Sequence, residues 1–374
     1  MIHASGWKTN LILVASTFSN LSSVATSQSP LKLRRMSTVT GIFLEFCNSI
    51  SHVALAQRAD LVLIAPATAH SIAKIVNGMA DDFLTTTVLA SKAPVVIAPA
   101  MDGYMFENPA TQDNLQKLKD RGIFVLGPGE GRLASGLTGF GRLVEVPYIV
   151  DAVASILGLR GDLQGRLLVV SAGGTQEPID PVRMITNRSS GKMGFAIARA
   201  ARDRGADVTL VSAPTSLQPI FGVKMRQVTT VSEMRTEVLD SCSNADVLIM
   251  AAAVSDYRPK KVFSEKIKKD SSDTDISIEF SKNDDFLLEV PIGVLKVGFA
   301  AESQHLIVNA KKKLVDKGLA LIAANDITSK DSGFNVDDNR VTILDQSGNL
   351  EEIPLMNKYD VAHRILDKVV KLLE

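Results

Sequence analysis

Eight short apolar runs recur along the chain, and longer stretches of helix-forming composition separate them. Within the runs, apolar residues follow one another rather than alternating with polar ones. This pattern is typical of strands in a parallel sheet that helices cover on both faces. The predicted fold class is therefore α/β. The runs occupy residues 59–66, 93–100, 122–128, 166–174, 206–214, 245–253, 295–303 and 319–326.

Start and stop signals place helices and a hairpin between these strands. A crossover helix is expected over residues 192–204, because Ser-Ser-Gly precedes it and Gly205 follows it. The segment 340–356 predicts a hairpin that turns at residues 347–349. A final helix is expected after Asn357, whose side chain can cap it. This order of elements predicts two Rossmann-like domains of three layers each.

Length and composition divide the chain into two domains. A chain of 374 residues is longer than one ordinary core requires, and the polar segment 159–166 is the best linker candidate. We assign residues 52–159 to the first domain and residues 160–374 to the second. Residues 1–51 are set apart as an atypical segment, because their composition differs from that of the rest.

Charge and cysteine content favour a small-molecule partner. Lysine plus arginine equals aspartate plus glutamate, 41 each, so bulk charge gives no indication of a nucleic acid or an acidic membrane. Only Cys47 and Cys242 occur, which fits a reducing, cytoplasmic location without disulfides. No apolar run reaches the roughly 18 residues of a membrane span.

The second half contains residues suited to an anion. Gly173 and Gly174 follow a strand, and Ser189, Ser190 and Gly191 open a helix whose free N–H groups attract negative charge. The spacing matches neither a P-loop nor the G-x-G-x-x-G of a dinucleotide dehydrogenase. A tight turn with an ordinary helix start explains the same residues, so both interpretations stay open.

Polar and basic residues follow the later strands. Asp256 and Tyr257 come after one strand, where open α/β sheets bind ligands. Lysine clusters lie on a loop and on a predicted helix, and lysine clusters are most often solvated faces. Their position beside strand ends favours a role in binding. The lysines are Lys266, Lys268, Lys269, Lys311, Lys312, Lys313 and Lys317.

Seven segments in the second half resemble the phosphopantothenate-cysteine ligase family. They are "SAGGTQEPIDPVRMITNRSSGKMG", "AAAVSDYRP", "EKIKK", "KND", "VGFAAES", "NAKKKLVDKG" and "AANDI". The resemblance implies that the carboxylate of 4'-phosphopantothenate attacks the α-phosphorus of CTP. The amine of cysteine then displaces CMP from the acyl-cytidylate. Asn187 would bind this intermediate, Arg183 would assist its turnover, and Lys266 would neutralise the triphosphate together with Mg²⁺.

The same resemblance implies a set of nucleotide contacts. The family has "KNPD" where this chain has "KNDD", so Asp284 replaces a proline. An added carboxylate beside a triphosphate is unfavourable unless it is exposed or paired, and we expect it to weaken CTP binding. The implied contacts are Gly173, Gly174, Ala252, Ala253, Asp256, Lys266, Asp284, Asp285, Phe286, Leu287, Phe299, Lys313 and Lys317.

Three segments within residues 52–145 resemble the flavin-dependent phosphopantothenoylcysteine decarboxylase family. In that family FMN oxidises the cysteinyl thiol to a thioaldehyde, an electron sink that makes loss of CO2 feasible. His52 matches the active-site histidine. Asp102 stands where many relatives have asparagine, and Ser135 stands where others have a lid cysteine. The FMN contacts implied are Ala65, Pro66, Ala67, Thr68 and Met101.

The beginning of the chain departs from this second family. Relatives have a glycine-rich turn that binds the flavin phosphate, and residues 1–51 contain nothing similar. We therefore expect FMN to bind weakly or not at all. The first 44 residues lack acidic side chains, as do organelle-targeting segments. We favour a disrupted or replaced amino terminus, because "SISHVALAQRAD" resumes the family pattern sharply.

Two other function classes remain open at this stage. A nicotinamide-dependent oxidoreductase would explain two Rossmann-like units, although the G-x-G-x-x-G is missing. A non-catalytic scaffold or regulatory subunit would explain a first domain that has lost its flavin site. By resemblance we expect a homo-oligomer in which the ligase domain dimerises.

Overall fold

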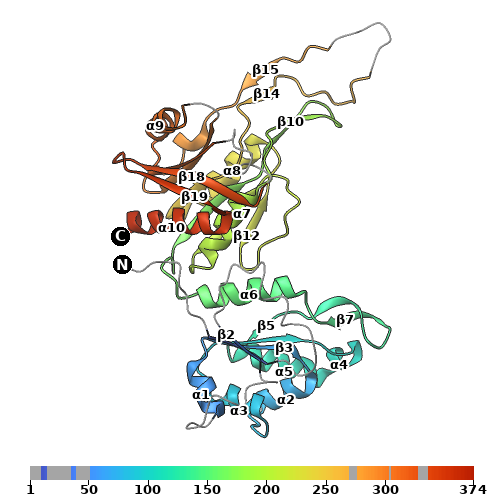
Figure 1. Cartoon of the computed structure of the whole chain (residues 1–374). Coiled ribbons are helices and arrows are strands. Elements are labelled where there is room, and N and C mark those ends of the chain that lie inside the picture. Colours follow the sequence, from blue (N-terminus) through green and yellow to red (C-terminus); the bar gives the residue numbers. More distant parts are fainter. Residues whose placement is uncertain (1–9, 15–34, 39–50, 269–275, 303–304, 327–335) are drawn as a thin grey trace. The chain divides into compact units, whose positions relative to one another are not determined.

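The computed structural model describes residues 10–14, 35–38, 51–268, 276–302, 305–326 and 336–374. The chain divides into two compact units, Met1–Leu157 and Gly158–Glu374, and Figure 1 shows their elements in sequence colours. Each unit is α/β, as the sequence predicts.

The first unit is built on a five-stranded parallel sheet. Its strand order is β2-β1-β3-β4-β5, and every pairing is parallel. All five residues of β4 are buried, as expected for a strand that is covered on both faces. The strands are β1 Asn10–Val14, β2 Arg35–Thr38, β3 Leu61–Ala67, β4 Val95–Pro99 and β5 Phe124–Val125.

Among the described residues of the first unit, six helices and a hairpin accompany the sheet. Alternate residues of β3, Val62 and Ile64, pack with Ile72 and Leu118 from two helices on one face. Their neighbours Leu61 and Leu63 are also buried, so the opposite face is covered too. The elements are α1 Ser51–Arg58, α2 Ala69–Val76, α3 Phe83–Ala90, α4 Gly103–Glu107, α5 Pro109–Asp120, α6 Val146–Gly158, β6 Gly129–Arg132 and β7 Thr138–Arg142.

Strands β1 and β2 come from the segment that the sequence analysis separates from the first domain. Leu11 of β1 pairs with Leu61 of β3, and β2 pairs with the other edge of β1. The sheet therefore extends beyond the predicted boundary at residue 52, because β3 offers a free edge to the short apolar run. The expected position of the missing glycine-rich turn, residues 15–34, lies outside the described residues.

The second unit contains an eight-stranded mixed sheet. Its order is β12-β11-β8-β13-β16-β17-β18-β19, and the last two strands run antiparallel at one edge. The predicted strands of this half are all present. The strands are β8 Leu167–Ala172, β11 Asp207–Ser212, β12 Lys224–Gln227, β13 Val247–Met250, β16 Leu295–Glu302, β17 Leu321–Asp326, β18 Asp338–Asp345 and β19 Leu350–Asn357.

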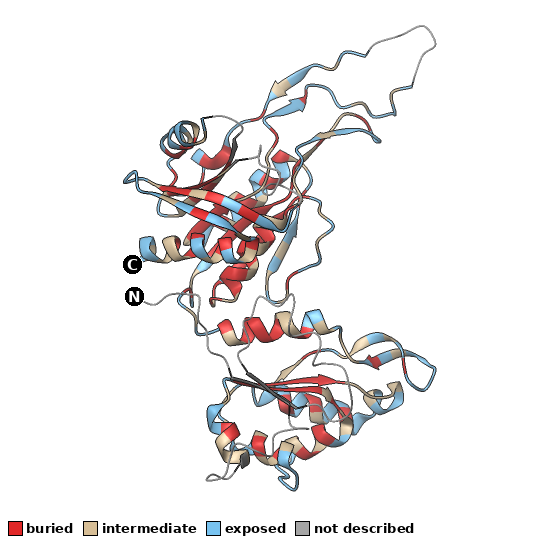
Figure 2. Cartoon of the chain, in the orientation of Figure 1, coloured by how far each residue is buried: buried red, intermediate tan, exposed pale blue. Residues whose placement is uncertain are grey.

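Helices cover both faces of this sheet and leave two apolar cores. On one face Leu168 and Val170 pack with α7 and α10, and on the other face Val169 packs with α8 and α9. Figure 2 shows that buried residues lie both in the central strands and on the helices that pack against them. The helices are α7 Lys192–Arg202, α8 Val231–Ser241, α9 Leu306–Asp316 and α10 Lys358–Leu373, with short 3-10 turns η1 Cys242–Asn244 and η2 Phe286–Leu288.

Local signals at the carboxyl terminus are confirmed. Strands β18 and β19 form the predicted hairpin around residues 346–349. The Asn357 side chain accepts a hydrogen bond from the Tyr359 N–H and caps α10. Two smaller antiparallel pairs were not predicted, namely β9 Gln176–Pro178 with β10 Met184–Thr186 and β14 Tyr257–Pro259 with β15 Phe280–Lys282.

Candidate functional site

A cavity of about 680 Å³ lies in the second unit, beside the end of β13 and the start of α7. Open α/β sheets generally bind ligands at this edge, the carboxyl ends of the parallel strands. Four stretches and seven single residues line it, and they are residues 187–193, 250–256, 282–287 and 298–300 with Lys313, Lys317, Leu319, Ile322, Asn325, Asn339 and Lys358.

Most of the predicted nucleotide contacts lie in this wall. They come from four separate segments of the chain that the sheet brings together. Gly173, Gly174, Arg183 and Lys266 are described residues that do not line the cavity. The predicted residues that do line it are Asn187, Ala252, Ala253, Asp256, Asp284, Asp285, Phe286, Leu287, Phe299, Lys313 and Lys317.

Gly173 and Gly174 contact the backbone of residues that line the cavity. The Gly173 carbonyl accepts a hydrogen bond from the Ala253 N–H at 2.8 Å, and Gly173 has a φ of 80° that favours glycine. A Cβ on Gly174 would lie 2.7 Å from the Asn187 carbonyl oxygen. The two glycines thus allow three backbone segments to approach one another closely.

Asn187 is held at the cavity by backbone groups. Its side-chain Nδ2 donates to the Val254 carbonyl at 3.1 Å and lies 3.4 Å from the Ala253 carbonyl. The neighbouring Thr186 hydroxyl donates to the Thr175 carbonyl at 2.8 Å. The amide is therefore oriented before any ligand arrives, as a group that binds an intermediate must be.

The start of α7 supplies backbone donors to the cavity. Gly191 at the amino-terminal cap has a φ of 75°, and the Lys192 N–H makes only a long hydrogen bond, 3.5 Å, to the Ser190 hydroxyl. A Cβ on Gly191 would lie 2.7 Å from the Thr215 methyl group. Ser189, Ser190 and Lys192 line the cavity at the same point. N–H groups without intrahelical partners make this helix start suited to an anion.

Two lysine side chains near the carboxyl-terminal end of α9, Lys313 and Lys317, also line the cavity. Lys317 Nζ forms an ion pair with Asp285 Oδ2 at 2.9 Å. The other oxygen, Asp285 Oδ1, accepts a hydrogen bond from the Leu287 N–H at 3.3 Å. Asp285 therefore anchors Lys317 beside the buried Phe286. Lys313, one turn earlier on α9, also lines the cavity.

Asn283 organises the wall around Asp256, and the sequence analysis did not identify it as a site residue. Its Nδ2 donates to the Ser255 carbonyl at 2.9 Å, and its Oδ1 accepts from Arg258 Nη1 at 2.7 Å. Its own N–H donates to the Asp256 carbonyl at 2.8 Å. The "KND" motif carries the signal, but only the folded chain shows that this side chain joins two loops.

Arg183 lies in a different polar cluster. Its Nη1 donates to Asp180 Oδ2 at 2.8 Å and to the Ile267 carbonyl at 3.2 Å. The Asp180 side chain is fully buried. Burial opposes ionisation of Asp180, yet the N–H groups of Val182, Ile267 and Arg183 hold its pKa below the usual range. Asp180 thus ties residues 180–183 to the loop that carries the exposed Lys266.

Three further polar residues in the lining, Asn325, Asn339 and Lys358, were not among the predicted contacts. Asn325 Oδ1 is buried and has no hydrogen-bond partner among the described residues. Asn339 and Lys358 are buried as well. Burial lowers the pKa of Lys358 to about 8, and the nearby Lys192 charge adds to this effect. Asn325 lies within the "AANDI" motif, whereas Asn339 and Lys358 lie outside every segment that carries the family resemblance.

In the first unit, the predicted flavin contacts lie at the end of β3. Ala65 and Ala67 are buried, and Pro66 and Thr68 are half-buried. Thr68 caps α2, since its hydroxyl accepts the Ser71 N–H at 3.2 Å. The predicted flavin contacts therefore lie together, in the last residues of β3 and at the start of α2.

The other predicted residues of this unit lie on three elements. Met101 donates its N–H to the Gly141 carbonyl at 2.9 Å, so the β6–β7 hairpin lies against the residues after β4. Asp102 caps α4 through the Tyr104 N–H at 3.1 Å. Ser135 is exposed at the turn of the hairpin. His52 lies on α1 with its ring edge-on to Phe83, 6.5 Å between centroids.

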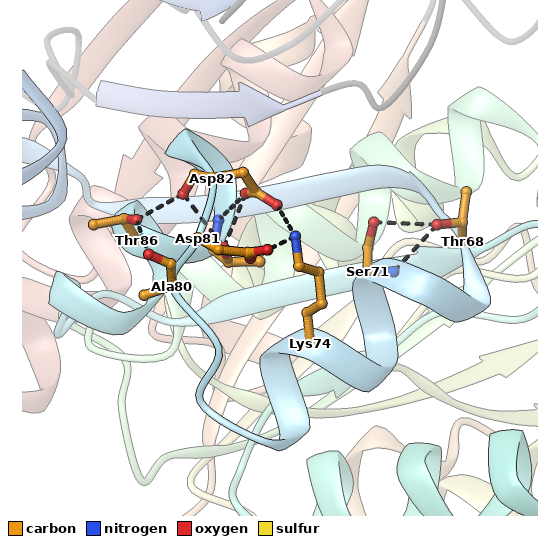
Figure 3. Close-up of polar contacts among 8 residues, drawn as sticks. Thr68, Ser71, Lys74, Ala80, Asp81, Asp82 and Thr86 are labelled. Carbon is orange, nitrogen blue, oxygen red and sulfur yellow. Dashed lines mark hydrogen bonds and ion pairs between the residues drawn. The ribbon is translucent and has the colours of Figure 1, made fainter.

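A buried lysine joins α2 to α3, as Figure 3 shows. Lys74 Nζ lies 2.5 Å from carboxylate oxygens of both Asp81 and Asp82. Asp82 also caps α3 through the Thr85 N–H. Burial opposes ionisation of Asp82, but Lys74 and Thr85 together lower its pKa to about 2. These residues connect two helices, and the sequence analysis missed them.

Within the described part of the chain, no three histidine, cysteine or acidic side chains are grouped so as to hold a metal ion. No described helix is both long enough and apolar enough to cross a membrane.

Comparison with known families matches both halves of the chain. Residues 163–373 match the "DNA/pantothenate metabolism flavoprotein C-terminal domain" family, and residues 8–158 match the "Flavoprotein" family. The second match begins within the segment that the sequence analysis sets apart.

Individual relatives agree with these family matches. The chain is 44% identical over 331 residues to the coenzyme A biosynthesis bifunctional protein CoaBC of Bacillus subtilis, covering 86% of this chain and 80% of that protein. It is 42% identical over 329 residues to the protein of the same name from Escherichia coli K12, with the same coverage.

A crystal structure of the C-terminal domain of a CoaBC protein is also similar, with 39% identity and a TM-score of 0.49. It covers 57% of this chain and 98% of that one. The extent of the sequence identity, together with the two family matches in this order, shows that the chain belongs to the family of bifunctional coenzyme A biosynthesis proteins.

Proposed function

We propose that the second unit joins 4'-phosphopantothenate to cysteine at the expense of CTP. The observation that carries this proposal is the cavity itself. One end offers the start of α7, a second region offers Lys313 and Lys317, and Asn187 lies in the same wall. An acid and a nucleoside triphosphate are both anions, so a site that joins them needs donors and cations in more than one place.

The reaction proceeds in two balanced steps. A carboxylate oxygen of the acid attacks the α-phosphorus of CTP, the bond to the bridging oxygen breaks, and pyrophosphate leaves. The cysteine amine then attacks the acyl carbon, CMP leaves with the carboxylate oxygen, and the amine loses a proton. Lys313 and Lys317 stabilise charge on the phosphates in the first step. The oriented Asn187 amide holds the mixed anhydride between the two steps.

We propose that Mg²⁺ binds together with CTP. Triphosphates are commonly bound as magnesium complexes, with protein side chains and water completing the coordination. Asp256 lines the cavity, and its carboxylate is an oxygen ligand of the kind that Mg²⁺ prefers. We expect ligation to require the ion.

Arg183 and Lys266 do not line the cavity, but we propose that both contact the nucleotide when it is bound. Asp180 hydrogen-bonds both the Arg183 segment and the Ile267 N–H. Asp180 therefore connects the segment of Arg183 to the loop of Lys266. We expect the two side chains to approach the triphosphate together.

The first unit is proposed to decarboxylate 4'-phosphopantothenoylcysteine with FMN. The family match supports a flavin, and the small residues at the end of β3 with the Thr68 hydroxyl fit such a cofactor. When bound, FMN supplies the two-electron chemistry that makes loss of CO2 feasible. Met101 and Asp102 lie where the β6–β7 hairpin contacts the residues after β4. The hairpin can therefore cover a substrate bound next to Met101 and Asp102. His52 is proposed to orient substrate or move a proton.

Family membership argues against the two alternative classes. Neither a nicotinamide oxidoreductase nor a non-catalytic scaffold is supported by the relatives, and the cavity in the second unit has the cations that a triphosphate needs.

The test is a ligation assay on the full chain with 4'-phosphopantothenate, CTP, Mg²⁺ and cysteine. We expect pyrophosphate to form only when the acid and CTP are both present, and the amide product to require cysteine. In the same assay, the Lys317→Met variant should have a KM for CTP about tenfold higher than the wild type, because it loses one charge-assisted contact. Pyrophosphate release that does not depend on the acid would refute the proposal.

A further inference from the structure

The short turn η2 forms the part of the cavity wall that packs between α8 and α9. Phe286 and Leu287 of this turn are buried and line the cavity. They belong to the same apolar core as Met234 of α8 and Leu314 of α9. Because apolar packing is non-directional, polar contacts are needed to fix the position of the turn.

One polar anchor precedes the turn and involves a cation that the nucleotide also needs. Asp285 pairs with Lys317 at 2.9 Å. Lys317 is also proposed to contact the phosphates of CTP. A triphosphate carries more negative charge than one carboxylate, so CTP competes with Asp285 for the ammonium group. The contact between Asp285 and Lys317 is therefore weakest when the nucleotide is bound.

A second anchor follows the turn and involves a cation of α8. Glu289 is the carboxyl-terminal cap of η2. Arg235 Nε donates to Glu289 Oε1 at 2.9 Å, and Arg235 Nη2 donates to Glu289 Oε2. Two parallel hydrogen bonds between planar groups fix orientation as well as distance. Both are described residues and neither lines the cavity, so CTP in the cavity does not compete for Arg235.

The exposure of this pair indicates a local effect rather than a global one. The side chains of Arg235 and Glu289 are 44% and 39% exposed. Exposed ion pairs add little to the free energy of unfolding. The hydrogen bonds from Arg235 lower the pKa of Glu289, so its carboxylate is charged near neutral pH. The pair can therefore hold the turn without being important for the stability of the unit.

We propose that Arg235 is a positioning residue for nucleotide binding, which acts through Glu289 to hold Phe286 and Leu287 in the cavity wall. This role rests on the proposed function, which makes CTP the ligand of the cavity. It explains why the turn is anchored from α8 as well as from α9. When Lys317 contacts the phosphates, the pair of Arg235 and Glu289 keeps the turn in place.

The test compares Arg235→Met, Glu289→Gln and the double variant in the full chain. The measurements are the KM for CTP, the KM for 4'-phosphopantothenate, and the Kd for CTP with Mg²⁺ from calorimetry. We expect each single variant to raise both CTP constants by about threefold to fivefold, the upper range for an exposed ion pair. The double variant should change no more than either single variant, because all three lose the same interaction. The KM for the acid should stay within about twofold of the wild type.

Two further variants separate positioning from a general loss of charge or stability. Arg226→Met removes another exposed ion pair of α8, with Glu237 at 4.0 Å, and should leave the CTP constants unchanged. Arg235→Lys keeps the charge but loses the two parallel hydrogen bonds, so its constants should lie between those of the wild type and Arg235→Met. If Arg235→Met does not fold, Glu289→Gln decides the question, because glutamine keeps the shape of the side chain.

The competing role for Arg235 is to offset the charge of Asp284, which also raises the pKa of Arg235. In that case Glu289→Gln would leave CTP binding unchanged or tighter, because Arg235 would be free to approach Asp284. Such a result overturns the proposal. Additive effects in the double variant, or CTP and acid constants that rise together, also overturn it. Absence of pyrophosphate release in the wild type would count against the proposed function alone, because the Kd for CTP still compares the variants.

Discussion

Asn187 shows how a single side chain depends on the surrounding backbone for its role. It is exposed, yet its amide nitrogen is hydrogen-bonded to Val254 and directed by the neighbouring Thr186. An amide fixed in this way loses little freedom when it binds an intermediate.

We predict that Asn187→Ala lowers kcat for amide formation by about tenfold to a hundredfold, the range for a lost contact to a charged group. Stability should change little because the side chain is exposed. The measurement is the rate of amide formation alongside thermal unfolding. A wild-type rate in the variant would show that the amide does not contact the reacting groups.

Asp284 is the residue at which the resemblance described above leads us to expect a proline. It lines the cavity and is exposed, and its charge contributes to raising the pKa of Arg235, after the larger effect of Glu289. Arg235 therefore offsets part of the repulsion that a carboxylate exerts on a triphosphate.

We predict that Asp284→Asn lowers the KM for CTP by about twofold to fivefold, as expected for an exposed charge. The difference should shrink as salt is added, because exposed charges are screened. Steady-state kinetics at low and high ionic strength test this, and a higher KM in the variant would show that Asp284 assists binding instead.

Sequence motifs contain more of the residues that line the cavity than they do of the lysines at the starts of α7 and α10. Asp256, Phe299 and Lys313 belong to motifs that a resemblance can recognise. Lys358 stands in an ordinary amphipathic helix, where a lysine usually lies on a solvated face. Only the packing of α10 on α7 brings it to the cavity, and no local pattern encodes that contact.

At the scale of elements, strands that are apolar on both faces were predicted reliably. β8 and β13 are buried throughout most of their length, and this leaves a clear signal in the sequence. The pairs β9–β10 and β14–β15 were missed because they are short ribbons with exposed residues, so neither period nor burial marks them.

The contact between α2 and α3 leads to a prediction about pH. The pKa of Asp82 is about 2 in the folded chain against an ordinary 3.8. A lowered pKa means that the stabilisation is present above the ordinary pKa and is lost as pH falls from about 4 to about 2.

We predict that Asp82→Asn weakens this acid dependence. Asparagine caps a helix as well as aspartate does, so the variant keeps the α3 cap and loses the charge beside Lys74. Thermal unfolding of the first unit across this pH range is the measurement. An unchanged slope in the variant would show that other carboxylates account for acid sensitivity.

At the scale of the whole molecule, chain length and the polar linker suffice to predict two units. The residue at which the first unit begins was harder to predict. β1 is a single apolar run in a segment of otherwise polar composition, and β2 has no apolar pattern at all. Their place in the sheet depends on pairing with β3, which is a long-range contact.

We predict that the purified protein contains less than stoichiometric flavin. The segment between β1 and β2 lacks the glycine-rich sequence that would let backbone N–H groups surround a phosphate. Visible absorbance of the purified protein and of the denatured supernatant measures occupancy. A yellow preparation with one FMN per chain would show that other groups replace this turn.

The central claim is that the acid's carboxylate attacks the α-phosphorus of CTP in the cavity of the second unit. The most direct measurement uses 4'-phosphopantothenate labelled with ¹⁸O in its carboxylate, followed by mass spectrometry of the products. The account predicts that one labelled oxygen appears in CMP and none in pyrophosphate. Label in inorganic phosphate, with CDP as the other product, would contradict it.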